Sequence, residues 1–159
     1  MKWFRCFVFT VLLVGSVADI NAAEPTVAET FLRQWAAAWK TSNVDRMMQF
    51  YDDGPETLAI ESLGHVRQGP EQIRKMFEGA FEELVFDRVS VTILTQKRQD
   101  SVAWATFRYR ANVRLKETQM KFVLQSRGTF ILRNDGKTWK IATEHFSTIP
   151  DVPRVQPDR

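Results

Sequence analysis

The chain has 159 residues, of which 44% are hydrophobic and 26% are charged, and its formal net charge is +3 with a pI near 9.2. Its basic residues alternate with acidic ones instead of clustering, which argues against a nucleic-acid partner. The charge leaves only a weak preference for anionic small molecules or surfaces.

Residues 1–23 are typical of a secretory signal peptide. Lys2 and Arg5 precede an apolar run over residues 6–14, and small residues follow at 15–18. Cleavage after Ala18 and cleavage near Ala22 or Ala23 both fit the sequence. The apolar run is well short of the roughly 20 residues that a membrane-spanning helix needs, so we expect export to the periplasm or the medium, with no membrane attachment after cleavage.

Removal of 23 residues leaves 159 − 23 = 136, which is enough for one domain with a core of its own and too few for two. We expect a single domain over residues 24–150 and a flexible tail over residues 151–159. The only cysteine, Cys6, lies in the removed segment. The mature chain therefore has no internal disulfide, and its fold must depend on packing.

Three helices are predicted in the first half of the mature chain. Thr26 and Glu29 have the spacing of a capping box, and an apolar stripe continues the first helix to Trp39. A second, shorter helix is expected after Asn43, and a third begins at Pro70. The apolar faces of these helices comprise Ala28, Phe31, Leu32, Trp35 and Trp39, then Val44, Met47, Met48 and Tyr51, then Ile73, Met76, Phe77, Ala80 and Phe81.

Strands are predicted where the apolar period changes to two, over residues 84–94, 101–115, 120–133 and 138–147. Residues 96–100 and 134–137 are expected to form the turns, and residues 57–60 a short additional strand. Helices followed by consecutive antiparallel strands indicate the α+β class. Long strands after three helices predict a strongly curved sheet wrapped around them, with a small-molecule pocket between the helices and the sheet.

Several segments resemble the SnoaL-like branch of the nuclear transport factor 2-like superfamily. These segments are residues 31–35 with Trp39, 50–53, 69–73, 127–129, 135–136, 139–141 and 144–147. The resemblance covers about residues 26–150 and implies a cone-shaped α+β fold with a cavity between helices and sheet. It implies no single activity, because the superfamily contains isomerases, dehydratases, cyclases and hydrolases beside proteins that only bind or assemble.

A more local similarity links the chain to the association domain of calcium/calmodulin-dependent protein kinase II. It rests on residues 61–65, Gly69, 107–109, His145 and Ser147. This resemblance implies self-assembly into a homodimer or a higher oligomer, and a pocket lined by Arg108 and Arg127.

Hydrophobicity and the kinase-domain resemblance give conflicting placements of these arginines, although both can hold in part if helices cover one face of the sheet and a partner subunit covers the other. Strict alternation along the strands puts His145 on the face of Ile141 and puts Arg108 on the face opposite Phe107. Hydrophobicity alone would turn the Phe107 face to the core, with His145 inside and the arginines in water. The kinase-domain resemblance would instead put Arg108 and Arg127 in the pocket.

Four residues are candidate ligand contacts. Arg108 and Arg127 suit a carboxylate, whose two oxygens match the guanidinium fork, although an arbitrary arginine on a strand is more often surface charge. Trp35 is more often a core residue than a ligand platform, but the first helix usually forms one pocket wall in this fold. Tyr51 is a candidate phenol.

Glu61 and His145 are the candidate proton carriers. A carboxyl group buried near apolar side chains would have a raised pKa and could act as a base, whereas a salt bridge or a loop cap is the structural alternative for Glu61. His145 fits a general base, a donor that orients a ligand or a hydrogen-bonded core residue. The second histidine, His65, is too far away in sequence to suggest a metal site, and no cofactor motif occurs.

Three functions remain open. The first is an exported small-molecule-binding domain, oligomeric and free of cofactors, that takes a small organic ligand such as a carboxylate. The second is a cofactor-independent isomerase, dehydratase or hydrolase that uses Glu61 or His145 for proton transfer. The third is a purely structural assembly domain.

Overall fold

The computed structural model describes residues 24–149, so the expected signal peptide and the expected tail over residues 151–159 lie outside the described residues. The three predicted helices are present: α1 (Val27–Trp39), α2 (Val44–Met48) and α3 (Pro70–Glu83). The capping box at Thr26 and Glu29 is complete, and the Asn43 side chain accepts from the Arg46 N–H at the start of α2. No helix in this part of the chain is long and apolar enough to cross a membrane.

Six strands in the described part of the chain form one sheet in the order β2-β1-β6-β5-β4-β3. They are β1 (Leu58–Ile60), β2 (Val66–Gln68), β3 (Leu84–Gln99), β4 (Val102–Leu115), β5 (Lys121–Asn134) and β6 (Trp139–Thr148). Neighbouring strands are antiparallel except β1 and β6, which run parallel. The α+β class is confirmed. The turn expected over residues 96–100 is shorter, because β3 continues to Gln99, and β2 was not predicted.

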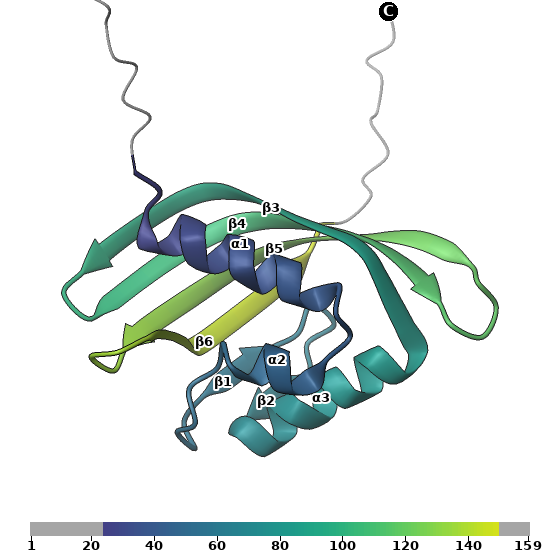
Figure 1. Cartoon of the computed structure of the whole chain (residues 1–159), viewed down its shortest axis with the longest axis horizontal. Coiled ribbons are helices and arrows are strands. Elements are labelled where there is room, and N and C mark those ends of the chain that lie inside the picture. The colour runs from purple at the N-terminus through teal and green to yellow at the C-terminus, as the bar shows by residue number, and fades with distance from the viewer. Residues whose placement is uncertain (1–23, 150–159) are drawn as a thin grey trace, which may run out of the picture.

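The sheet curves around α1, while α2 and α3 lie beside its β1 and β2 end (Figure 1). The core fills the space between them and is rich in aromatic rings. The Trp35 ring of α1 packs edge-on against Phe107 and Phe130 and stacks on Phe146. Because these rings come from α1, β4, β5 and β6, they join the helical layer to the sheet.

The apolar face of β4 lies against the helices, as hydrophobicity predicts. Phe107 is fully buried, whereas its neighbour Arg108 is exposed on the outer face of the sheet. The cross-strand neighbour of Arg108 is Arg127, which is also exposed. The two predicted pocket arginines therefore point away from the interior of the cone.

A β-bulge in β6 overturns the prediction that His145 shares the face of Ile141. Leu132 of β5 pairs with Ile141 and Ile131 pairs with Thr143, which leaves Ala142 as an extra residue. An extra residue reverses the alternation after it. Glu144 therefore points into the core and is 3% exposed, while His145 lies on the outer face and is exposed.

Candidate functional site

The interior of the cone contains one hydrogen-bonded acid and phenol. The Tyr51 hydroxyl donates to Oε2 of Glu144 at 2.7 Å, and both side chains are buried. The chain after α2 holds Tyr51 against β6, because the Asp52 N–H donates to the Ile141 carbonyl and the Ile141 N–H donates to the Phe50 carbonyl. The bulge at Ala142 brings Glu144 to the same place from the other side.

Burial controls the protonation of this pair. It raises the pKa of Glu144 to about 8, with a smaller raising effect from the Glu61 carboxylate and an opposing effect of the Tyr51 hydrogen bond. Burial and the nearby Glu144 also raise the pKa of Tyr51 well above its ordinary value. The two groups are therefore mostly neutral near pH 7, and a carboxyl group with a pKa near neutrality suits proton transfer.

Two indole groups lie in the same region without hydrogen-bond partners. Nε1 of Trp35 and Nε1 of Trp39 are buried and make no hydrogen bond. The Trp35 N–H approaches the Tyr51 hydroxyl closely enough to lower the pKa of that phenol slightly, against the larger effect of burial, but its geometry is not that of a hydrogen bond. An unsatisfied buried donor costs about 1–3 kcal/mol. The two indole N–H groups therefore remain available to donate a hydrogen bond.

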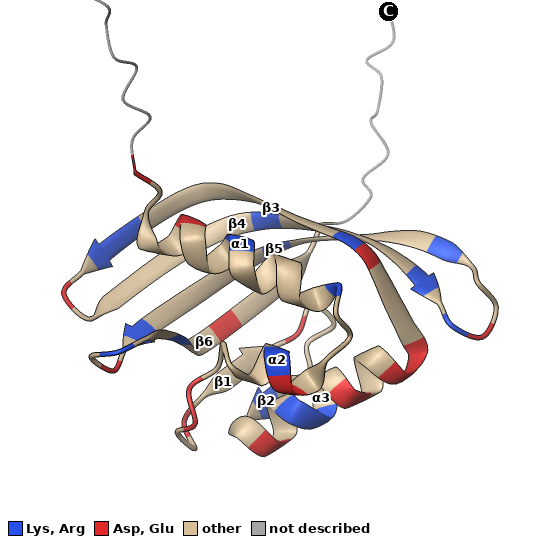
Figure 2. Ribbon diagram, in the orientation of Figure 1, with Lys and Arg blue, Asp and Glu red and all other residues tan. Residues whose placement is uncertain are grey.

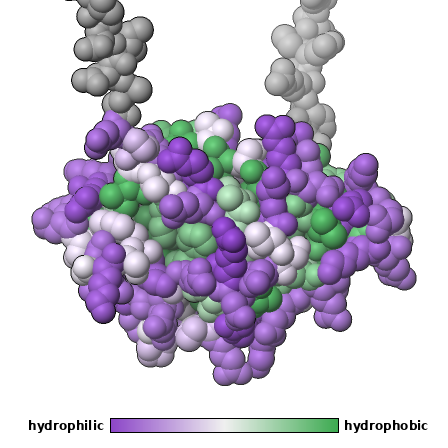
Figure 3. Space-filling view, in the orientation of Figure 1, coloured by the Kyte–Doolittle hydropathy of each residue, from purple (hydrophilic) through white to green (hydrophobic). Residues whose placement is uncertain are grey.

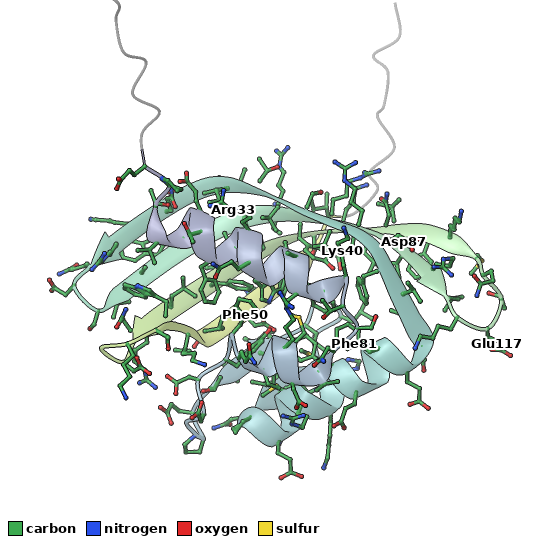
Figure 4. The ribbon with its side chains drawn as sticks, in the orientation of Figure 1. Arg33, Lys40, Phe50, Phe81, Asp87 and Glu117 are labelled. Atoms are coloured by element: carbon green, nitrogen blue, oxygen red, sulfur yellow. The ribbon has the colours of Figure 1, made fainter. Side chains whose placement is uncertain are left out.

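A groove of about 670 Å³ opens at the surface beside this interior. It lies between the start of α1, the chain after α2 and the start of β6. Figure 4 shows Phe50 in this space below α1, and Figure 3 shows apolar residues reaching the surface of this face between hydrophilic ones. The groove is lined by Pro25, Thr26, Val27, Thr30, Phe31, Gln34, Gln49, Phe50, Thr138, Trp139 and Lys140.

The groove and the Tyr51–Glu144 pair are separate sites, because neither Tyr51 nor Glu144 lines the groove. The Phe31 ring lies between the groove and the core, with its centroid 5.4 Å from that of Phe50 and 6.4 Å from that of Phe130. The groove offers open volume for a ligand. The interior offers groups that can transfer a proton.

The two predicted proton carriers do not meet the predicted phenol. Oε1 of Glu61 accepts from Nε of Arg67 at 2.8 Å and lies 3.9 Å from Nδ1 of His65. This ion pair is the structural alternative that the sequence left open for Glu61. His145 pairs in the sheet with Thr129 and Ile60 and faces outward, away from Tyr51.

The candidate ligand contacts are divided between the two sides of the sheet. Trp35 and Tyr51 are buried inside, and Tyr51 contacts Glu144, whereas Arg108 and Arg127 lie next to each other outside. Sequence reasoning missed Glu144, because strict alternation put its side chain on the other face of the strand from Ile141 and Trp139. The alternation of apolar and polar residues in β6 gave no sign of the bulge that turns the Glu144 side chain inward.

Comparisons with known proteins agree with this architecture. The SnoaL-like domain family matches residues 28–151. The structure is similar to a ketosteroid isomerase-like protein from Erwinia carotovora atroseptica, with 17% identity, a TM-score of 0.69, and coverage of 81% of this chain and 98% of that one. No curated protein matches the chain.

Two other solved structures are similar. One, from Xanthomonas campestris, is described as a calcium/calmodulin dependent protein kinase II association domain; it has 25% identity and a TM-score of 0.57, with 79% of this chain and 87% of that one covered. The other is a nuclear transport factor 2-like superfamily protein from Salmonella enterica serovar Typhimurium, with 13% identity, a TM-score of 0.66, and coverage of 81% and 93%.

Within residues 24–149, no cluster of three or more His, Cys, Asp or Glu residues is arranged to hold a metal ion.

Proposed function

The chain belongs to the SnoaL-like domain family, and from this premise we propose that it is an exported small-molecule-binding protein whose ligand occupies the groove between α1 and the start of β6. The observation that carries the proposal is the aromatic-lined groove of about 670 Å³, a volume within the usual range of small-molecule sites.

The lining of the groove supports a ligand with an apolar body and an anionic group. Phe31, Phe50 and Trp139 supply aromatic surface, while Gln34 and Lys140 supply polar contacts. The Lys140 ammonium donates to the Gln49 carbonyl, so its position at the groove is held by the chain after α2. A carboxylate on the ligand would pair with this ammonium group.

Naphthalene-2-carboxylate and its neutral primary amide are suitable probes, because they share the ring and differ in charge. We expect the carboxylate to bind the mature chain more tightly than the amide by about tenfold, which corresponds to about 1.4 kcal/mol. Lys140→Gln should remove this difference, and Trp139→Ala should weaken both probes. Calorimetry or ligand-observed NMR measures the affinities.

Lys137→Gln is the matched control, because Lys137 is exposed on the turn before β6 and does not line the groove. It should leave both affinities unchanged. Binding of neither probe, or equal binding in Trp139→Ala and the unchanged protein, would contradict the groove as the ligand site.

A second candidate function is cofactor-independent proton transfer at the buried pair. It is favoured by the Tyr51–Glu144 hydrogen bond and by the pKa of Glu144 near 8. Glu144 and Tyr51 would then take the part that the sequence suggested for Glu61 or His145. Since both groups are buried, a substrate would reach them only when the aromatic side chains around them move.

Exchange of the α-protons of 2-tetralone in deuterated water tests this second function. The protein should accelerate the exchange over buffer, and Glu144→Gln and Tyr51→Phe should each remove most of the acceleration, while Glu61→Gln and His145→Gln should keep it. Loss in Glu61→Gln or His145→Gln with retention in Glu144→Gln would favour the original candidates instead. Exchange at the buffer rate in the unchanged protein would exclude this reaction.

A further inference from the structure

The outer face of the sheet has an excess of positive charge. Apart from Lys140 at the groove and Arg133, which pairs with acidic residues of the chain after α2, strands β3 to β6 contain eight Lys and Arg residues but only two acidic residues, Asp87 and Glu144. Glu144 is buried on the inner face, and Asp87 pairs with Arg114 at 3.1 Å. Much of the acidic charge lies elsewhere, for example on α3 (Figure 2).

A second β-bulge directs one of these arginines outward. Phe86 pairs with Val113 and Arg88 pairs with Asn112, which leaves Asp87 as the extra residue. Asp87 lies where β3 bends toward α3 (Figure 4). Phe86 is buried on the inner face, so strict alternation would have put Arg88 inside as well. The bulge instead places Arg88 on the outer face, where it is exposed.

Arg88 and Arg110 border a depression of about 280 Å³ on this face. Its other lining residues are Ser90 and Asn112. Arg88 is the cross-strand neighbour of Asn112, and Ser90 is the cross-strand neighbour of Arg110. The two arginines therefore lie diagonally across the two strands, on the same face of the sheet. The Ser90 hydroxyl donates to the Arg110 carbonyl at 3.3 Å and ties the two strands together at the floor of the depression.

No carboxylate of the described residues neutralises this pair. Neither Arg88 nor Arg110 forms an ion pair within residues 24–149, and the same holds for the neighbouring Arg108 and Arg127. Like charges opposite or diagonal to each other on adjacent strands repel and destabilise the sheet. An anion from outside the chain would relieve this repulsion.

We propose that the depression bordered by Arg88 and Arg110 is a binding site for a phosphate-type dianion. Two guanidinium forks from adjacent strands and the Asn112 side-chain amide can present N–H donors from several directions. A tetrahedral anion has oxygens directed toward all of them, whereas the two oxygens of a carboxylate are satisfied by a single fork. The ligand is therefore a phosphate group, either on a small soluble molecule or on a lipid headgroup.

Inorganic phosphate is the first probe, added to the full mature chain at low ionic strength, where charge pairs on a surface are screened least. We expect saturable binding by calorimetry, with NMR shift changes in β3 and β4. Arg88→Gln and Arg110→Gln should each weaken binding about tenfold or more. Phosphate should also raise the melting temperature above that in chloride of equal ionic strength, and this rise should disappear in both variants.

Arg33→Gln is the matched control, because Arg33 is exposed on α1 and its substitution removes the same charge from another surface (Figure 4). It should leave phosphate binding within about twofold of the unchanged protein. A second arm uses phosphatidylcholine vesicles with and without phosphatidic acid, and it separates a lipid source of the phosphate from a soluble one.

Binding in either arm with the expected pattern of variants supports the site and identifies the source. Absence of binding in both arms, or an equal loss in Arg33→Gln, would overturn it. The phosphate experiment and the groove experiment test different residues, because neither the aromatic carboxylate probe nor the Lys140→Gln variant involves Arg88 or Arg110. Failure of one proposal therefore leaves the other intact.

Discussion

Glu144 is a buried acid with a hydroxyl partner and, among the described residues, no cation to pair with. The groups that influence it are Tyr51, which donates to it, and Glu61, whose negative charge raises its pKa. Burial is the largest cause, so the neutral form is favoured in the folded protein up to about pH 8. The single side chain therefore links folding to pH.

The direction of this effect follows from proton binding. Between the ordinary value of 4.5 and about 8, the folded protein retains a proton on Glu144 that the unfolded chain has lost. The free energy of unfolding should therefore fall as pH rises, by at most about 1.4 kcal/mol per pH unit, and level off above the folded pKa. Urea unfolding at about pH 5.5 and about pH 7.5 measures the slope.

Glu144→Gln is the control for that slope, because glutamine keeps the shape of the side chain and does not titrate. The variant should lose most of the decrease between the two pH values. A slope as steep in Glu144→Gln as in the unchanged protein would show that other groups are responsible.

At the scale of single elements, β5 depends on a residue without a side chain. Gly128 lies on the inner face of the sheet opposite Phe146, and a Cβ atom built on it would lie 2.5 Å from Cζ of Phe107 and 2.8 Å from Cε1 of Phe146. Both rings belong to the packed aromatic core and have little room to move. The glycine therefore allows β4, β5 and β6 to bring their rings together.

We expect Gly128→Ala to lower the free energy of unfolding by about 1–3 kcal/mol, because the added methyl group overpacks the core. Gly79→Ala is the matched control: Gly79 is exposed in α3 and has open space around its Cβ position. The control should stabilise the protein by about 0.5–1 kcal/mol, since alanine favours the helix. Denaturant unfolding measures both, and an equal effect of the two substitutions would contradict the packing argument.

At the scale of the whole molecule, the outer face of the sheet has a basic end at Arg88 and Arg110 and, further along the strands, an end with exposed apolar side chains beside Lys97, called the apolar end here. Trp104 and Ile131 are cross-strand neighbours on this face, and Ile131 is 43% exposed. Arg110 lies six residues further along β4, about 20 Å away in an extended strand. The apolar end can therefore meet a second copy of the chain without bringing the depression at Arg88 and Arg110 into the contact.

We propose self-association through this apolar end, and we expect the mature chain to be at least a dimer by sedimentation or light scattering. Ile131→Lys should shift it toward the monomer, because it adds charge to an already cationic face. Leu63→Lys is the control, since Leu63 is 82% exposed in the loop between β1 and β2. A strict monomer at high concentration, or dissociation in both variants, would contradict this interface.

The sequence by itself was enough for the fold class and for the order of every element except β2. Capping residues such as Thr26 and Asn43, and the unbroken alternation around Phe107 in β4, depend on contacts within one helix or one strand. These local signals predicted the helices and the four long strands, whereas the side of β4 that forms the core stayed open between hydrophobicity and the kinase-domain resemblance. They also supported the resemblance to the SnoaL-like family, which the comparisons confirm.

Only the tertiary structure decided which charged groups face the interior and which face the outside. The bulges at Asp87 and Ala142 exist because one strand has a residue more than its partner over the same length, so they are properties of strand pairs. Each reverses the alternation after it, which turns Arg88 outward and Glu144 inward. Pattern reasoning within a single strand cannot detect such a reversal, and for this reason it selected His145 instead of Glu144.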